Sequence, residues 1–112
     1  MKEVTIKIKP MSVNVAWRGG RRFISNQYKI YTKAVLALLP PLKIPSNKMM
    51  LVLDVGFSSK SADLDNCIKP ILDLLQKKYL FNDKQVYRID ACKEIVKKGE
   101  EYFTFQLFDY PC

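Results

Sequence analysis

Alternating apolar and polar residues predict strands near both ends of the chain. Residues 4–9 alternate valine and isoleucine with threonine and lysine until Pro10, which is the period of a strand with one buried face. Residues 102–108 form an aromatic-rich strand pattern, and residues 87–95 alternate with an interruption at Lys93. Residues 49–57 are almost continuously apolar, a pattern that favours a central strand. The sequence therefore predicts four strands.

A helix is expected between the first two strands. It runs from an N-cap at Ser25 to about Leu39, where Pro40 and Pro41 stop it. Its apolar stripe comprises Tyr28, Tyr31, Val35, Leu38 and Leu39.

Pro70 bears on where a second helix begins. This helix should carry Ile71, Leu72, Leu74, Leu75 and Tyr79. Proline is tolerated in a first turn but costs about 3 kcal/mol inside a helix, so we expect regular helix to start between residues 67 and 69 unless the helix kinks. Residues 63–66 then form an entry turn, in which Asp63 and Asp65 project to the same side.

The predicted elements follow the order β-α-β-α-β-β along one domain of residues 1–112. Residues 97–100, Lys-Lys-Gly-Glu, are typical of a hairpin turn between the last two strands. Two helices and about four strands in this order favour an α+β fold with a single mixed β-sheet.

Charge favours a polyanionic partner. The 112 residues hold 19 Lys and Arg against 11 Asp and Glu, a net charge of +8, and nucleic acid is the commonest partner of so basic a small domain. No stretch reaches the ~20 apolar residues that span a bilayer, and the first residues form no signal-peptide core. We therefore expect a cytoplasmic protein that does not bind membranes.

Cysteine usage and short motifs exclude other classes of site. Cys67, Cys92 and Cys112 are widely spaced and include no CxxC pair, which favours reduced thiols over a disulfide framework or a zinc site. Neither a GxxxxGK[ST] phosphate loop nor a GxGxxG motif occurs. A nucleotide cofactor therefore has no support.

An acidic island interrupts this basic chain. Its residues are Asp63, Asp65, Asn66, Lys69 and Asp73, followed by Asn82 and Asp83. Two carboxylates about 4 Å apart repel by about 4 kcal/mol at an effective dielectric of about 20, and Mg²⁺ or Mn²⁺ offsets that cost while sharing phosphate oxygens. The chain has no histidine, which excludes Ser-His-Asp and Cys-His catalysis. This combination favours metal-assisted phosphodiester cleavage.

A basic loop is a candidate for contacts to DNA. Residues 11–22 include Asn14, Trp17, Arg18, Arg21 and Arg22, a composition suited to gripping phosphates and stacking a base. Lys60, in the loop before the acidic island, is a further candidate. A solvated loop with Trp17 packed on the core is the alternative for residues 11–22.

Two blocks of the sequence resemble the RusA-type Holliday junction resolvases, small basic endodeoxyribonucleases of phages and prophages. Residues 63–69, Asp-Leu-Asp-Asn-Cys-Ile-Lys, are similar to the family's DLDNxxK segment. Residues 80–86, Leu-Phe-Asn-Asp-Lys-Gln-Val, are similar to its aromatic-x-Asp-Asp-x-Gln-Val block. Residues 10–14 and the basic loop resemble the family more loosely.

The resemblance implies roles for particular residues. The catalytic, metal-binding carboxylates would be Asp63, Asp65 and Asp83, with Lys69 as the essential lysine. The metal would be Mg²⁺, for which Mn²⁺ can substitute. Asn66 is a candidate for orienting a carboxylate or for binding the metal through its amide, and Asp73 is either a partner of these groups or simply a polar residue of the helix. Asn82 stands where many members have the first of two adjacent aspartates, which lowers the charge of the site but leaves Asp83 in place.

The resemblance also implies a homodimer that cuts four-way DNA junctions by paired nicks, because a two-fold enzyme matches a pseudo-two-fold substrate. Three other functions stay open. The first is a non-catalytic DNA- or RNA-binding module, in which the aspartates only cap a helix and form turns. The second is a nuclease for other branched DNA, and the third is a structural protein that binds an acidic protein partner.

Overall fold

The computed structural model describes residues 3–10 and 26–110. In chain order, the elements there are strand β1 Val4–Ile6, helix α2 Asn26–Leu38, strand β2 Met49–Phe57, helix α3 Asp65–Tyr79, the 3₁₀ turn η1 Asp83–Gln85, strand β3 Val86–Ile95 and strand β4 Tyr102–Asp109. The predicted order of strands and helices is confirmed. Ser25, the predicted N-cap of the first helix, lies outside the described residues.

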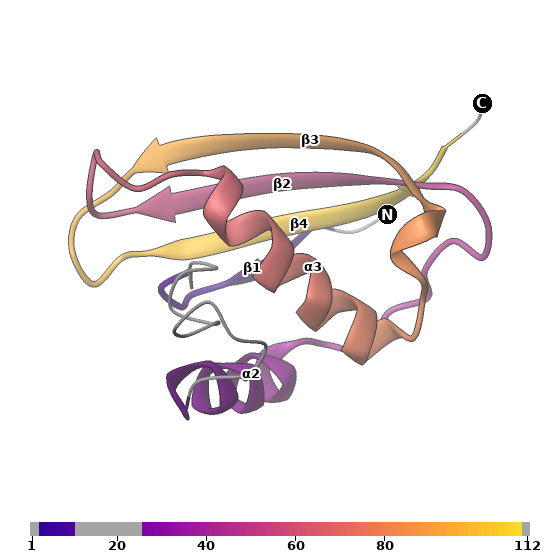
Figure 1. The fold of residues 1–112 in the computed structure, drawn as a ribbon, viewed down its shortest axis with the longest axis horizontal. Coiled ribbons are helices and arrows are strands. Elements are labelled where there is room, and N and C mark those ends of the chain that lie inside the picture. The colour runs from indigo at the N-terminus through magenta and orange to yellow at the C-terminus, as the bar shows by residue number, and fades with distance from the viewer. Residues whose placement is uncertain (1–2, 11–25, 111–112) are drawn as a thin grey trace.

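The four strands form one mixed sheet in the order β1-β4-β2-β3. Strand β2 is parallel to β3 and antiparallel to β4, and β4 pairs antiparallel with β1. Strand β2 therefore lies inside the sheet, as its apolar run predicts, whereas β3 and β1 form the edges (Figure 1). The predicted α+β fold with a single mixed sheet is confirmed.

The turn at residues 97–100 does not close a hairpin. The Glu100 amide donates to the Lys97 carbonyl over 2.9 Å, and Gly99 has a φ of 95°, a region that favours glycine. The strands that this turn joins, β3 and β4, have β2 between them, so the expectation of a hairpin is wrong. Phe103 and Phe105 of β4 are fully buried, and a place inside the sheet removes more of their apolar surface from water than an edge would.

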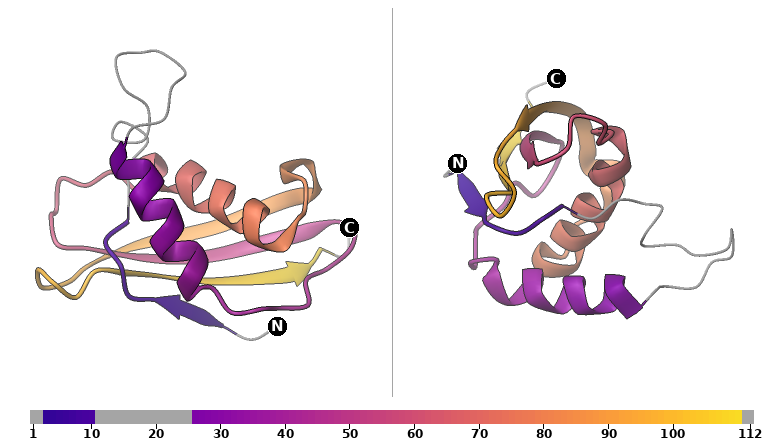
Figure 2. Two further views of the ribbon diagram at one scale, coloured as in Figure 1. Left: turned by 90° about the horizontal axis from the view of Figure 1, so that it is seen from below. Right: turned by 90° about the vertical axis from the view of Figure 1, so that its left-hand side faces the viewer.

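Both helices cover the same face of the sheet (Figure 2). The core between the layers includes Leu51, Leu53, Val55, Phe103, Phe105 and Leu107 from the sheet, Val35 from α2, and Ile71, Leu74 and Leu75 from α3. Each such side chain stabilises the fold by about 1.5–3 kcal/mol when fully buried. The Tyr79 hydroxyl donates to the Pro40 carbonyl over 2.6 Å, which ties the end of α3 to the chain leaving α2.

Helix α3 begins at Asp65, earlier than the expected residues 67–69, and Pro70 lies inside it. Pro70 has no amide to donate to the Asn66 carbonyl one turn earlier, which costs the helix a hydrogen bond. Its ring is buried, and that burial offsets part of the cost. Asp65 consequently lies in the first turn of the helix and not in an entry turn.

Two smaller expectations also differ from the structure. Leu38 was expected in the apolar stripe of α2 but is 55% exposed, because the helix ends there and Leu39 takes the buried place. Strand β1 ends at Ile6 instead of residue 9, since its pairing with β4 stops at that residue. Among the described residues, no helix is long and apolar enough to cross a membrane.

Candidate active site

The acidic segment lies where the chain passes from β2 into α3. Asp63 precedes the helix, and Asp65 lies in its first turn, where the unpaired amides of a helix N-terminus favour negative charge. The Asn66 side-chain Nδ2 donates to Asp63 Oδ2 over 3.4 Å, and the Asn66 amide donates to the Asp63 carbonyl over 3.3 Å. Asn66 therefore contacts a predicted catalytic carboxylate directly. Such a contact is required of a residue that orients the carboxylate.

Cys67 anchors this first turn in the core. Its Sγ donates to the Leu64 carbonyl over 3.1 Å, and its side chain is 1% exposed. Burial raises the pKa of the Cys67 thiol to about 11, and the charge of Asp65 adds to the rise. Because only the thiolate binds metals well, Cys67 stays a neutral packing residue next to the carboxylates.

Lys69 and Asp73 form an ion pair one turn apart on α3, with 3.7 Å between Lys69 Nζ and Asp73 Oδ1. Residues four apart share a side of a helix, so Lys69 also follows Asp65 along the same side. The Lys69 side chain is 62% exposed, and exposed pairs of this kind contribute about 0–1 kcal/mol. The ammonium group can therefore exchange Asp73 for a phosphate at little cost.

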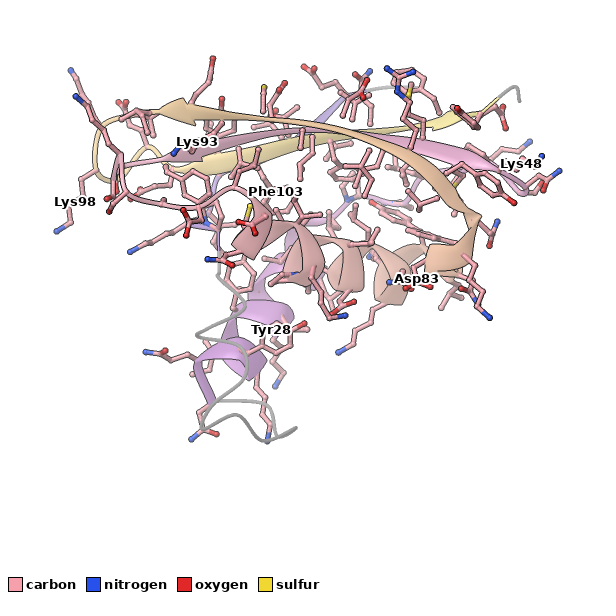
Figure 3. All side chains as sticks on the ribbon, turned by 45° about the horizontal axis from the view of Figure 1, so that its top comes forward. Tyr28, Lys48, Asp83, Lys93, Lys98 and Phe103 are labelled. Carbon is pink, nitrogen blue, oxygen red and sulfur yellow. The ribbon has the colours of Figure 1, made fainter. Side chains whose placement is uncertain are left out.

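Asp83 lies at the other end of α3. Its amide donates to Gln76 Oε1 over 3.1 Å, which fixes it beside the last turns of the helix. At 1.5 Å per residue, Gln76 is about 16 Å along the helix axis from Asp65. Figure 3 shows Asp83 at the end of the molecule away from Lys93. Within one chain Asp63 and Asp65 lie at the start of α3, and Asp83 lies beyond its other end. The residue between Asp63 and Asp65 is helical, so the expected projection of these two side chains to the same side does not follow from an extended entry turn.

Asn82, beside Asp83, stabilises the start of η1 as its N-cap. Asn82 Oδ1 accepts from the Lys84 amide over 2.9 Å, and Gln85 Oε1 accepts from the Asn82 amide over 3.1 Å. This capping box opens η1. Asparagine and aspartate cap about equally well, so asparagine at this position preserves the turn that holds Asp83.

The sequence matches the family model described as endodeoxyribonuclease RusA over residues 7–101. The chain belongs to the RusA endodeoxyribonuclease family. The match spans most of the 112 residues and includes both blocks on which the resemblance rests, residues 63–69 and 80–86. None of the curated proteins matches the sequence.

In this RusA-family chain, Lys93 is a residue near the site that the sequence reasoning missed. Its Nζ donates to the carbonyls of Ala62 over 2.8 Å and Lys60 over 3.3 Å, both in the loop directly before Asp63. The signal was the interruption of the alternation in residues 87–95. On β3, Lys93 lies beside Val55 of β2, where the alternation of the strand predicts an apolar residue. Its hydrogen bonds link β3 to the loop before the acidic segment.

The donors at the start of α3 fit a hard divalent cation. Asp63 and Asp65 offer carboxylate oxygens and Asn66 an amide oxygen, and Mg²⁺ is commonly held by one or two carboxylates together with waters and phosphate oxygens. In residues 3–10 and 26–110, no three His, Cys, Asp or Glu side chains gather closely enough to hold a metal ion. The third predicted carboxylate, Asp83, therefore does not join this set within one chain.

A cavity of about 730 Å³ lies beside Asp63 and Asn66. Its wall includes Pro10 and Gln27, so described residues after β1 and at the start of α2 lie next to the acidic segment. Four of the predicted DNA-binding residues lie outside the described residues, namely Asn14, Arg18, Arg21 and Arg22. The fifth, Lys60, is exposed in the loop that Lys93 holds.

Proposed function

We propose that this chain is a metal-dependent endodeoxyribonuclease that resolves four-way DNA junctions by paired, symmetric nicks in recombination and repair. The family match over residues 7–101 carries the proposal. The clustering of Asp63, Asp65 and Lys69 around the first turns of α3 supports it, and a net charge of +8 favours a nucleic acid substrate.

Each residue of the cluster has a defined task in this proposal. Asp63 and Asp65 hold Mg²⁺, or Mn²⁺ in its place, and Asn66 keeps Asp63 oriented toward it. When bound, the ion supplies activation of water and neutralisation of charge on the phosphoryl group. Lys69 places its ammonium where negative charge develops on the phosphate oxygens in the transition state. Lys93 holds the loop that leads into Asp63.

The test is cleavage of a labelled four-way junction beside a linear duplex of matched sequence, each with Mg²⁺, Mn²⁺ or EDTA. We expect paired nicks in the junction only, and only with metal. Asp65→Asn should keep junction binding and lower the cleavage rate more than about 100-fold, beyond what loss of a group that only orients a metal ligand costs. Asp109→Asn is the matched control, because Asp109 pairs with Met49 at the opposite end of β2.

A non-catalytic binder of branched DNA is the second candidate. It is favoured by the finding that no three metal-binding side chains gather in the described part of one chain. A binder would hold the junction tightly without cutting it in any metal, and Asp65→Asn would leave binding unchanged. A nuclease for flaps or forks would share the whole site, so both substrates belong in the same assay.

A further inference from the structure

The cavity beside Asp63 and Asn66 has no task in the proposed function, although it borders the acidic segment. Its wall is built from the chain after β1, one side of α2, and the segment that leads from the end of β2 into α3. Its volume of about 730 Å³ falls within the about 300–1,000 Å³ of pockets that enclose small organic ligands. The cavity therefore has room for such a ligand beside the predicted metal ligands.

Apolar and aromatic side chains form most of this wall. Helix α2 contributes Ile30, Tyr31 and Ala34, which are spaced to share one side of the helix, and β2 ends in Phe57. Ile30 is 70% exposed, so a ligand that covered it would remove apolar surface from water. An apolar wall desolvates a charged group without pairing it, which excludes a phosphate from the interior of the cavity.

The aromatic and amide groups of the same wall fit a nucleobase. Tyr31 and Phe57 carry rings, and any base stacks favourably on an aromatic ring. Gln27 has a side-chain amide that both donates and accepts hydrogen bonds, which matches the polar edges of a base. Bases are uncharged at neutral pH, so the carboxylate of Asp63 does not repel them as it repels a phosphate. Size, lining and charge thus favour the same kind of ligand.

We propose that this cavity binds one nucleoside of the strand that is cut, turned out of the base stack and joined to the phosphate that is cleaved at Asp63 and Asp65. The inference rests on the proposed function. Because Asp63 is itself part of the wall, a nucleoside in the cavity lies directly beside the phosphate at the metal ligands.

A four-way junction is the DNA from which such a nucleoside is most easily taken. Turning a base out of a duplex costs unstacking energy, and the cost is least where pairing is already interrupted. A junction interrupts the stack where its strands exchange, whereas a linear duplex does not. A cavity for one unstacked nucleoside therefore favours cleavage of the junction over cleavage of the duplex.

Disulfide cross-linking locates the base directly. Ala34→Cys is introduced into a Cys92→Ser, Cys112→Ser background and mixed in EDTA with four-way junctions that carry a thiol-reactive tether on one base at a time. Wild-type protein with Mg²⁺ or Mn²⁺ identifies the nicked phosphate on the same junction. We expect cross-linking at one nucleotide next to that phosphate, because only a base outside the stack reaches the cavity.

Ala37→Cys in the same background is the matched control. Ala37 is also exposed on α2 but is not part of the cavity wall, so it should cross-link no nucleotide selectively. If the wild-type protein cuts the junction but Ala34→Cys cross-links no nucleotide beside the nick better than Ala37→Cys, the inference is overturned and the proposed function stands. A wild-type protein that cuts in no metal overturns the proposed function, and the inference with it.

Filling the cavity tests whether the base matters for cleavage. Ala34→Trp places a large side chain in the cavity from an exposed position of α2. It should slow cleavage of the intact junction at least about fivefold, the low end of the effect of base stacking on an aromatic ring. On a junction that lacks the cross-linked base, the variant should cut as fast as wild type, because no base then needs the space.

Equal rates on the junction without that base also show that Ala34→Trp is folded. Ala37→Trp adds the same side chain outside the cavity and should match wild type on both junctions. Equal slowing of both junctions by Ala34→Trp, or slowing of neither, would show that the base does not enter the cavity.

Discussion

The role of Lys93 leads to a quantitative prediction about metal binding. Lys93→Met keeps the aliphatic stem of the side chain and removes the two hydrogen bonds to the Lys60 and Ala62 carbonyls. Hydrogen bonds from a charged donor contribute about 1.5–3 kcal/mol when shielded from water, and Lys93 is exposed. Solvent competes for both bonds, so we assign the pair about 1 kcal/mol.

That energy should be lost partly as stability and partly as metal affinity. If each takes about 0.5 kcal/mol, the Mn²⁺ concentration for half-maximal cleavage rises about twofold, and the rate at saturating Mn²⁺ changes little. The melting temperature should fall by about 2 °C. Both values come from a Mn²⁺ titration of junction cleavage and from thermal unfolding followed by circular dichroism.

Two further variants distinguish this positioning role from general loss of charge. Lys93→Arg keeps a donor that can reach the same carbonyls and should recover most of the Mn²⁺ affinity. Lys98→Met removes one positive charge from the exposed turn after β3 and should behave as wild type. A Lys93→Met protein with the Mn²⁺ dependence of wild type would refute the reasoning, even if its melting temperature fell.

The other predictions concern the sheet and the thiols. A methyl group at Gly56 would overlap the ring of Tyr102 on the neighbouring strand, so Gly56→Ala should lower the free energy of unfolding by about 1–3 kcal/mol in urea, and an unchanged value would show that the ring moves freely. The thiol of Cys92 donates to Asp54, which raises its pKa above the usual value. In a Cys112→Ser background, Asp54→Asn should therefore move the pH profile of Cys92 alkylation to lower pH, while buried Cys67 stays unreactive until unfolding. An unshifted profile would remove Asp54 as the cause.

Much of the fold was predictable because each strand has its own recognisable pattern of apolar and polar residues. The apolar run at residues 49–57 predicted both the bounds and the central place of β2. The alternation of β3 and the aromatic residues of β4 predicted the strands but not their neighbours. Sheet order depends on which strands bury the most surface together, and a turn sequence such as residues 97–100 describes only the local change of direction.

The candidate site was predictable in its parts but not in its assembly. The sequence predicted Asp63 and Asp65 beside the start of a helix, and the structure places Lys69 one turn beyond Asp65 on that helix. The same spacing implied a helix between Asp65 and Asp83, and its length separates these two residues within one chain. The sequence motif alone does not show whether residues 80–86 act together with residues 63–69 of the same chain. The three-dimensional structure is needed to decide this.

Two residues near the acidic segment depart from the usual sequence preferences of the strand or helix in which they lie. Lys93 places a charge where the alternation of β3 calls for an apolar side chain, and it bonds to the loop before Asp63. Pro70 lies inside α3 and withdraws a backbone donor from the Asn66 carbonyl. Departures of this kind are expected where function outweighs local stability. The N-terminus of α3 has no side-chain cap, so helix capping does not account for the oxygen donors there, whereas a bound cation would.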